Sequence, residues 1–446
     1  MAPAPDHHDD DGRALLHDTA AVEMEEAFED GDRAFQPGTM RSLFAHRDFR
    51  LAFSGAVFSN IGTWMQNIVL AAYAWELTGS ASFVGVMTFA NLGPQFFFAM
   101  IGGALADTYD RRIVVTVCSI AQMVLVFALA ALVASDDPSR IALLGLVFAI
   151  GIASALVAPA FTSLLPGLVP DEEIQGAVSL AAANMNLSRV VGPALGGIMF
   201  ALVGASWVFV VNGFSYLFMI AGVLAVRTRP RPSVAAQLPP LKRVASGFGI
   251  VWRDPVLRRA VSSIAIFSIF GLGFLTQLPV VSSENLGIPA DSVGYGLLYA
   301  TLAAGSLVGA LAVGFLMKDR SLESMVRLSL IGFALITVVL AVISGPVAAY
   351  PTTFVVGLTY FVATTAMVTV VQRRVGDQER GRVLAVWMMA LAGTLPLGSV
   401  IAGTLVEATS VTAALLVAAT SSLLLVGYAD LRDRAAPAGQ VAPATP

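Results

Sequence analysis

The sequence predicts an all-α polytopic membrane protein with twelve transmembrane helices in two pseudo-symmetric six-helix bundles. Of its 446 residues, 57% are hydrophobic and 13% charged, whereas soluble domains average about 45–50% apolar and about 25% charged residues. Apolar runs of about 18–26 residues recur along the chain, and a helix needs about 20 residues to cross a bilayer. The few charges are also sorted along the sequence, which a soluble surface would not require.

The order of elements begins with residues 1–40, predicted to be a disordered acidic tail on the cytoplasmic side. Residues 1–39 contain 11 acidic residues against Arg13 and Arg33, and high net charge with low hydrophobicity favours disorder. The tail has no basic and apolar signal-peptide pattern. Twelve spans follow, at 51–76, 82–105, 113–134, 140–163, 177–202, 206–226, 260–282, 293–316, 326–344, 348–370, 383–406 and 411–429.

Lysine and arginine predict the orientation of these spans, because cytoplasmic loops carry an excess of both. With the N-terminus inside, 24 of the 26 basic residues fall on the cytoplasmic side. Arg140 falls outside and Arg189 lies within a span. The sorting therefore predicts an even number of spans in the cytoplasmic membrane, with both termini inside.

The longest interior polar stretch, 227–259, divides the spans into bundles at 41–226 and 260–430, with a cytoplasmic tail at 431–446. Within it, 241–253 fits an amphipathic helix on the inner leaflet, and a plain linker fits equally well. The halves echo each other: Val169-Pro-Asp171-Glu-Glu173 before the fifth span is similar to Val375-Gly-Asp377-Gln-Glu379 before the eleventh. Internal repeats of this kind are typical of secondary transporters, whose substrate site lies between the repeats.

Three groups of motifs resemble the major facilitator superfamily, over residues 41–430. Its signature between helices two and three is matched by Gly103-Ala-Leu-Ala-Asp107-Thr-Tyr-Asp110-Arg111-Arg112, with Thr108 where a basic residue is usual. The fifth-helix antiporter signature is matched by Ser188-Arg189-Val-Val-Gly192-Pro193-Ala-Leu-Gly196-Gly197, with Ser188 replacing a glycine. The transmembrane secretion effector branch, which includes siderophore and macrolide exporters, is matched by Gly62-Thr-Trp-Met-Gln66, Leu77-Thr-Gly-Ser80 and Asp377-x-x-Arg380-Gly-Arg382-Val.

The resemblance implies export of a small molecule in exchange for protons, without an enzymatic step or a cofactor. It also implies that Asp107 meets the start of the eleventh helix, near Arg380 and Arg382, where the helix dipole favours an anion. Such a clamp would join the two halves on the cytoplasmic side and stabilise the outward-open state. Gly103 and its neighbours would permit a tight turn and close backbone approach. Alternatively, Arg111 and Arg112 only set the topology.

In the fifth span, Gly192 and Gly196 form a small-xxx-small pattern that lets two helices pack closely, and Pro193 is expected to bend the helix. Static packing and a gating role that prevents leakage, implied by the antiporter signature, both remain open. Arg189 lies about 12 residues into this span, about 18 Å deep. A charge at that depth faces a cavity or a partner, so a substrate-path role and a hydrogen bond to helix carbonyls are equally open.

Polar and aromatic side chains at helical spacing mark the candidate substrate cavity, whose wall would suit a bulky, lipophilic molecule. The alternative for an aromatic stripe is ordinary helix packing. The candidates are Asn60, Trp64, Gln66, Asn67, Asn91, Gln95, Asn184, Phe270, Phe274 and Gln277. Glu76 and Glu407 lie at the outer ends of their spans, where interfacial solvation is the favoured interpretation. Glu76 is nevertheless the best-placed carboxylate for a coupling proton, and Glu284 is a weaker candidate.

Several other classes of function are disfavoured. The chain has no phosphate-binding loop for an ATP-driven pump. Its four histidines precede the first span and Cys118 is its single cysteine, so no metal site is expected. Nucleic-acid binding has no support. The expected partners are a small-molecule substrate, protons and membrane lipid, for a monomer. A facilitator or importer of a polar solute is the main alternative, and a membrane receptor or scaffold the more distant one.

Overall fold

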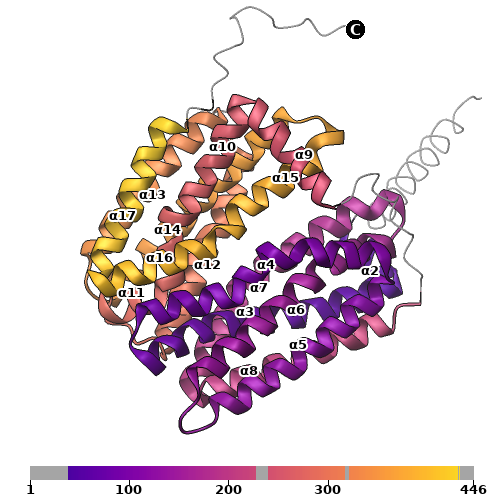
Figure 1. The fold of residues 1–446 in the computed structure, drawn as a ribbon, viewed down its shortest axis with the longest axis horizontal. Helices are drawn as coiled ribbons and strands as arrows, with labels where there is room; N and C mark the ends of the chain where they lie inside the picture. The colour runs from indigo at the N-terminus through magenta and orange to yellow at the C-terminus, as the bar shows by residue number, and fades with distance from the viewer. Residues whose placement is uncertain (1–38, 228–239, 317–320, 430, 432–446) are drawn as a thin grey trace, which may run out of the picture.

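The computed structural model describes residues 39–227, 240–316, 321–429 and 431, and all regular structure in these ranges is helical. Two groups of long helices lie side by side (Figure 1). One group contains α2–α8, coloured indigo to magenta, and the other contains α9–α17, coloured salmon to yellow. The proposed acidic tail with His7, His8 and Asp9–Asp11, and the C-terminal tail beyond 431, lie outside the described residues.

The first half begins with a short helix and continues through six long ones. Two 3-10 turns, η1 (Leu165–Leu168) and η2 (Asp171–Glu173), precede the fifth long helix. The helices are α2 (Met40–Ala45), α3 (Arg47–Thr78), α4 (Ala81–Thr108), α5 (Arg111–Val133), α6 (Arg140–Leu164), α7 (Ile174–Val203) and α8 (Ala205–Leu224).

The second half contains six spans after the connecting helix α9 (Pro240–Arg253). The seventh and eleventh spans of the chain, which are the first and fifth of this half, are each interrupted by a π-helical turn. The other spans of this half are continuous. The elements are α10 (Pro255–Ile266), η3 (Phe267–Gly271), η4 (Gly273–Gln277), α11 (Leu278–Glu284), α12 (Val293–Leu316), α13 (Leu322–Val342), α14 (Pro346–Arg374), α15 (Asp377–Met388), η5 (Met389–Gly393), α16 (Leu395–Ala408) and α17 (Val411–Tyr428).

The two halves repeat one packing pattern. The second long helix packs on the fourth in each half, α4 on α6 and α12 on α14. The third packs on the sixth in each half, α5 on α8 and α13 on α17. The halves meet where α4 packs on α16 and α7 packs on α12. The predicted arrangement of two pseudo-symmetric bundles is therefore confirmed.

Eleven helical stretches among the described residues are long and apolar enough to cross a membrane. The 32-residue α3, which contains the predicted first span, is not one of them. Its composition explains this, because the amides Asn60, Gln66 and Asn67 lie in the middle of the helix. The helix is enclosed by α7 and α8, so its polar side chains do not have to meet lipid.

The least distinct boundary in the sequence, between the ninth and tenth spans, is a short turn in the structure. α13 ends at Val342 and α14 begins at Pro346. Gly345 between them has a φ of 103°, a conformation that favours glycine. The separation of these two spans is therefore confirmed.

Most arginines of the described residues lie at one end of the bundle, whereas Arg140 lies at the other. We call the end that contains Arg112, Asp254 and Arg374 the basic end, and the end that contains Ser80 and Glu407 the acidic end. Because successive helices alternate in direction, the loops after α4, α6, α8 and α14 all lie at the basic end. The sorting of charge along the sequence is thus a sorting in space.

The connection between the halves contains a helix. α9 packs on α15 and also contacts α4. A Cβ added at Gly247 would lie 2.5 Å from the carbonyl oxygen of Arg382, so the two helix backbones almost touch. Of the two interpretations of 241–253, the structure supports the helix over the plain linker; the connecting residues 228–239 lie outside the described part.

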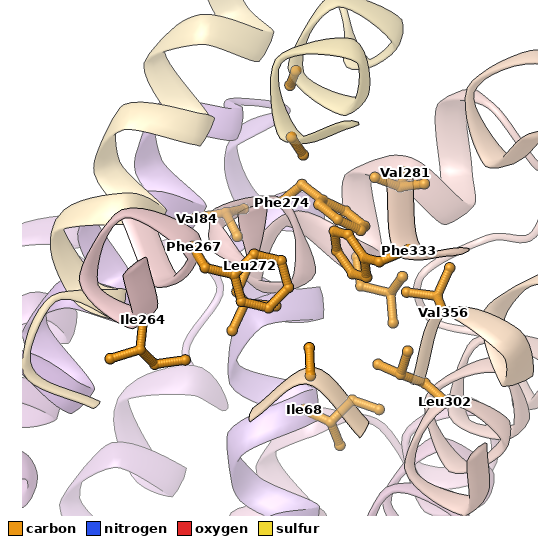
Figure 2. Close-up of a cluster of buried hydrophobic side chains, with 14 of the residues drawn as sticks. Ile68, Val84, Ile264, Phe267, Leu272, Phe274, Val281, Leu302, Phe333 and Val356 are labelled. Carbon is orange, nitrogen blue, oxygen red and sulfur yellow. The ribbon is translucent and has the colours of Figure 1, made fainter. Parts of the chain in front are cut away.

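A continuous apolar core joins the two halves around η3, η4 and α13 (Figure 2). Phe267 and Phe333 meet edge to face with ring centroids 5.0 Å apart, and Phe274 packs on the other side of Phe333. Ile68 and Val84 of the first half belong to the same cluster. Phe274, one of the predicted cavity residues, therefore serves packing, as does Phe267.

Candidate functional site

A cavity of about 240 Å³ lies between the two halves, near the middle of the helices. Both halves contribute to its wall, as expected for a substrate site between repeats. The apolar part is formed by leucines and aromatic rings from α3, α4, η4, α12 and α14. The polar part is formed by Asn67, Thr88, Asn91, Asn186, Arg189, Thr276, Tyr295, Tyr299, Ser306 and Tyr360.

Three of the ten predicted cavity residues line this cavity. Trp64 and Asn67 reach it from α3 and Asn91 reaches it from α4. The Asn91 amide donates a hydrogen bond of 3.0 Å to the side-chain oxygen of Asn67. This pair fixes the orientation of both amides in the wall. Two of the four predicted residues on α3, Trp64 and Asn67, thus face the cavity.

The other seven do not line the cavity. Gln66 accepts a 2.7 Å hydrogen bond from Asn212 of α8, and Asn184 accepts one from Ser188 in its own helix. Gln277 is fully buried and donates to the Ser399 carbonyl. Phe274 lies in the core described above. Asn60 is half-buried, Gln95 and Phe270 are exposed, and none of them contributes to the wall.

The prediction missed the tyrosines of the second half. Tyr295 and Tyr299 of α12 and Tyr360 of α14 line the cavity. In the first half, Asn186 of α7 was also missed as a wall residue. Tyr295 and Tyr299 stand at i and i+4 on a helix that also has glycines at 305 and 309, and this spacing was the available signal.

Arg189 of α7 lines the cavity. This position agrees with a role on the substrate path, which was one of the two roles that the sequence left open. Its guanidinium carbon lies 5.1 Å from the centre of the Trp64 ring, within the range of a cation–π contact. Its Nε atom is buried without a hydrogen-bond partner. Among the described residues it bonds to no helix carbonyl, so the purely structural alternative has no support.

The glycines of α7 make close helix contacts, as the small-xxx-small pattern predicts. A Cβ at Gly192 would lie 3.0 Å from the Ile61 carbonyl oxygen of α3, and one at Gly196 would lie 3.0 Å from the Met65 Cα. Gly197 instead faces Gly296 of α12 in the other half, where a Cβ would lie 2.8 Å from the amide nitrogen. Pro193 lies inside a continuous helix. Thus one motif joins α3 within its half and α12 across the halves.

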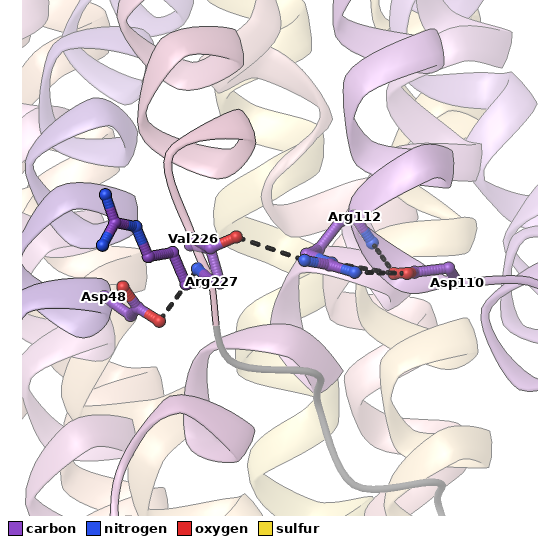
Figure 3. A network of polar contacts seen from close by, with 5 residues as sticks. All are labelled: Asp48, Asp110, Arg112, Val226 and Arg227. Carbon is purple, nitrogen blue, oxygen red and sulfur yellow. Dashed lines mark hydrogen bonds and ion pairs between the residues drawn. The ribbon is translucent and has the colours of Figure 1, made fainter.

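At the basic end, the charged residues after α4 bond within the first half (Figure 3). Asp110 caps α5 and accepts from the Arg112 side chain at 2.8 and 3.3 Å. Arg112 also donates to the Val226 carbonyl after α8, and Arg111 to the Ser163 carbonyl of α6. Buried Asp48 accepts from the Arg227 amide nearby. These bonds hold the basic ends of α3, α5, α6 and α8 together.

The predicted contact of Asp107 with the start of the eleventh span is not formed in this conformation. Asp107 is exposed, with no hydrogen bond or ion pair to any described residue. Arg382 instead contacts Ser246 of α9 at 3.4 Å and Glu379 at 3.7 Å. The expected close approach at Gly103 is also absent here, since a Cβ there would meet no described atom within 4 Å. Gly102 makes that approach, with a Cβ 2.8 Å from the Ala155 carbonyl oxygen.

At the acidic end, by contrast, the halves are bonded to each other. Glu407 of α16 accepts from the Ser80 hydroxyl at 2.6 Å and from the Ser82 amide at 2.8 Å, both at the start of α4. Deeper along the same helices, the Ser399 hydroxyl donates to the Gly85 carbonyl at 3.0 Å. Glu76 is exposed at this end, in a pocket that also contains Asp291 of the other half. The acidic end is thus held together by hydrogen bonds between the two halves.

Comparisons with known proteins agree with this architecture. The family model described as transmembrane secretion effector matches residues 39–442. The staphyloferrin A transporter of Staphylococcus aureus is 27% identical over 355 residues, covering 78% of this chain and 87% of that protein. The enterobactin exporter EntS of Shigella boydii is 26% identical over 300 residues, covering 65% and 68%.

Solved structures show the same fold at low sequence identity. The nucleoside transporter NupG has a TM-score of 0.70 at 12% identity, covering 86% of this chain and all of that one. A bacterial homologue of the iron transporter ferroportin has a TM-score of 0.67 at 17% identity, covering 86% and 97%. From its helices, its inter-half cavity and these matches, the chain belongs to the transmembrane secretion effector family of the major facilitator superfamily, a family of transporters and not of enzymes.

Proposed function

We propose that the protein exports a small, lipophilic molecule, such as a drug, a siderophore or another secondary metabolite, by alternating access. The observation that carries this proposal is the cavity between the two halves, whose wall combines leucines and tyrosines with a few amides. A largely apolar pocket with few, fixed polar groups suits a drug-sized ligand. Two relatives are named staphyloferrin A transporter and enterobactin exporter, and the second name supports the direction of transport.

Alternating access requires that the two ends open in turn. Bonds between the halves at Glu407 close the acidic end, and at the basic end Asp107 is exposed. We assign the basic end to the cytoplasm, because arginine-rich loops remain inside. The conformation is then the inward-open one, both ends of the chain lie in the cytoplasm, and the protein resides in the cytoplasmic membrane.

The proposed gate at the basic end closes when Asp107 reaches the N-terminus of α15, near Arg380 and Arg382. A carboxylate at a helix N-terminus is stabilised by up to about 1 kcal/mol when exposed. Asp107→Asn should therefore insert normally and lower transport by about fivefold. Asp136→Asn, a charge removed from an exposed acidic-end loop, is the matched control. Undiminished flux in Asp107→Asn would contradict the gating role.

Proton coupling is the second part of the proposal. Efflux of a fluorescent lipophile from cells is measured with and without a protonophore. Collapse of the proton gradient should stop export of the lipophile against its own concentration gradient. Glu76 is the proposed proton carrier because it lies between the halves at the acidic end. Glu76→Gln should then transport equally with and without the gradient. Gradient-dependent efflux in that variant would remove Glu76 from the mechanism.

A facilitator or importer of a polar solute is the alternative. One observation favours it: no aspartate or glutamate is among the described residues that line the central cavity. A facilitator would equilibrate its substrate without a gradient. Efflux of the lipophile that is unaffected by the protonophore, together with uptake of a polar solute, would decide for this alternative.

A further inference from the structure

The charge of the central cavity is unbalanced. Its wall contains the guanidinium of Arg189, and no acidic side chain among the described residues that line it. Arg189 is half-buried, with its Nε atom fully buried, and removing part of a cation from water without a partner is costly. The described residues provide no such pair, since Arg189 forms no ion pair with any of them and its buried Nε bonds to none. The cavity therefore contains a positive charge that an anionic ligand would neutralise.

The surroundings hold the guanidinium in place but do not neutralise it. Trp64 lies under it at 5.1 Å, and an aromatic ring restrains the plane of a guanidinium while leaving its N–H edge free. The Trp64 Cβ is itself fixed by close contact with Gly192 of the same helix as Arg189. A residue that is held in one orientation loses less entropy when it binds a ligand.

Hydrogen-bond donors from the other half complete the site. Tyr299 of α12 and Tyr360 of α14 line the cavity together with Arg189. Both lie close enough to interact electrostatically with it. An oxyanion between them would accept from the guanidinium and from phenol O–H groups, and bonds to an ionised acceptor are roughly twice as strong as neutral ones.

We propose that Arg189 is the anion receptor of the cavity and that the transported molecule carries a carboxylate on an otherwise apolar body. The planar guanidinium matches a carboxylate in two parallel hydrogen bonds. The apolar body packs against Trp64 and the leucines of α3, α4 and α12. This inference rests on the proposed function and narrows its substrate from a lipophile to an amphiphilic anion.

Binding to the purified protein tests the inference without requiring transport. The probes are 1-naphthylacetate and 1-naphthylacetamide, which share one apolar body and differ in charge. Wild type should bind the acid more tightly by about tenfold or more, the factor for a hydrogen bond to a charged group. Arg189→Gln should bind both probes equally, and Arg189→Lys should keep a weaker preference for the acid. Arg140→Gln, at an exposed helix start, should behave as wild type.

Two results of the binding experiment overturn the inference: equal binding of the two probes by wild type, or a preserved preference for the acid in Arg189→Gln. Thermal unfolding of each variant shows whether it is folded, and Arg189→Lys keeps the test valid if Arg189→Gln is not. Efflux of both probes from proteoliposomes separates the two proposals. Preferred binding of the acid without any efflux would contradict the proposed export and still support Arg189 as the anion receptor. Gradient-driven efflux of the amide alone would contradict the receptor and leave the exporter standing.

Discussion

Buried polar side chains in the first half are of two kinds. Gln66 and Asn212 bond to each other between α3 and α8, and the half-buried Asn67 and Asn91 bond to each other in the cavity wall. Arg189, in contrast, has an unsatisfied Nε. A buried group whose bonding is complete stabilises packing, and one whose bonding is incomplete is available to a ligand. Among the described first-half side chains with a buried unbonded atom, Thr116, Glu173 and Arg189, it is Arg189 that lines the cavity.

Gln66 tests the first kind. Both side chains are almost fully buried, so Gln66→Leu leaves the Asn212 amide without its acceptor. We expect a coupling energy between Gln66 and Asn212 of about 0.6–1.7 kcal/mol, the range for hydrogen bonds between helices in a membrane. Unfolding in mixed micelles of Gln66→Leu, Asn212→Leu and the double variant measures it. Additive effects of the two single changes would show that the bond contributes nothing.

Gly197 tests contact between the halves at the level of one atom. A Cβ there would lie 2.8 Å from the Gly296 amide nitrogen, a backbone atom that cannot move aside cheaply. Gly197→Ala should disfavour the conformation closed at the acidic end by about 1–3 kcal/mol, the usual cost of overpacking. Cysteine accessibility from the acidic end should rise.

The control for Gly197→Ala is Gly145→Ala in α6, where an added Cβ meets no described atom within 4 Å. It should leave accessibility unchanged and raise the stability of the helix by about 0.5–1 kcal/mol. Equal accessibility in the two variants would remove Gly197 from the contact that closes this end.

Among the helices, the breaks are unevenly distributed between the halves. The first and fifth helices, α3 and α7, run without interruption. Their counterparts in the second half are broken into α10–η3–η4–α11 and α15–η5–α16. Isolated π-turns inside helices are often found at functional sites, and the wall residues Leu272, Leu275 and Thr276 come from one of these breaks. The second half thus supplies the irregular side of the cavity.

At the basic end, α10 contacts both α9 and α14. Asp254 accepts from the Val256 and Leu257 amides and pairs with Arg374 at 2.5 Å. Burial acts to raise the pKa of the Asp254 carboxyl, but the Arg374 guanidinium and the two amides outweigh it, so the pKa lies below its usual value. The carboxylate is therefore charged at neutral pH and serves both as a helix cap and as half of an ion pair.

Substitutions at Asp254 separate these two roles. Asp254→Asn keeps a capping side chain and loses the ion pair, which at this partly exposed position contributes up to about 1 kcal/mol. Asp254→Ala loses the cap as well, which adds about 1 kcal/mol. Thermal unfolding in detergent should therefore rank wild type above Asp254→Asn and Asp254→Ala last. Equal melting of the two variants would mean that the cap is not significant.

For the whole molecule, we expect the contacts between the halves to determine which end is open. Helix pairs α4–α16 and α7–α12 form the interface, and near the acidic end it carries the bonds of Glu407 and Ser399. Each bond is worth little by itself. A change of about 1 kcal/mol is nevertheless enough to shift the equilibrium between two conformations of similar free energy.

Glu407→Ala removes both bonds from α16 to the start of α4. We expect a larger population open at the acidic end, by up to about fivefold. Spin labels at Leu77→Cys and Ala408→Cys, in a background without Cys118, report the separation of the halves. A distance distribution identical to that of wild type would show that the Glu407 contact does not influence the equilibrium. Thr404→Ala, whose hydroxyl bonds within its own helix, is the control.

The sequence by itself determined the fold class, the boundaries between spans, the sorting of arginines and the family. These features are local, since each depends on hydropathy over one helix length or on a continuous motif such as 103–112. It also identified Arg189, because a charge in the middle of an apolar run is visible without any neighbour. The division into two halves followed from one polar stretch.

The tertiary structure alone decided which polar and aromatic side chains meet in the cavity. Phe274 and Gln277 had the spacing of a wall, yet the breaks at η3 and η4 rotate the chain so that they face α13 and α16. Tyr299 and Tyr360 lie on different helices and meet Arg189 only because α7 packs on α12 and α12 on α14. Helical periodicity defines the sides of one helix, and only packing decides whether a side faces lipid, core or cavity.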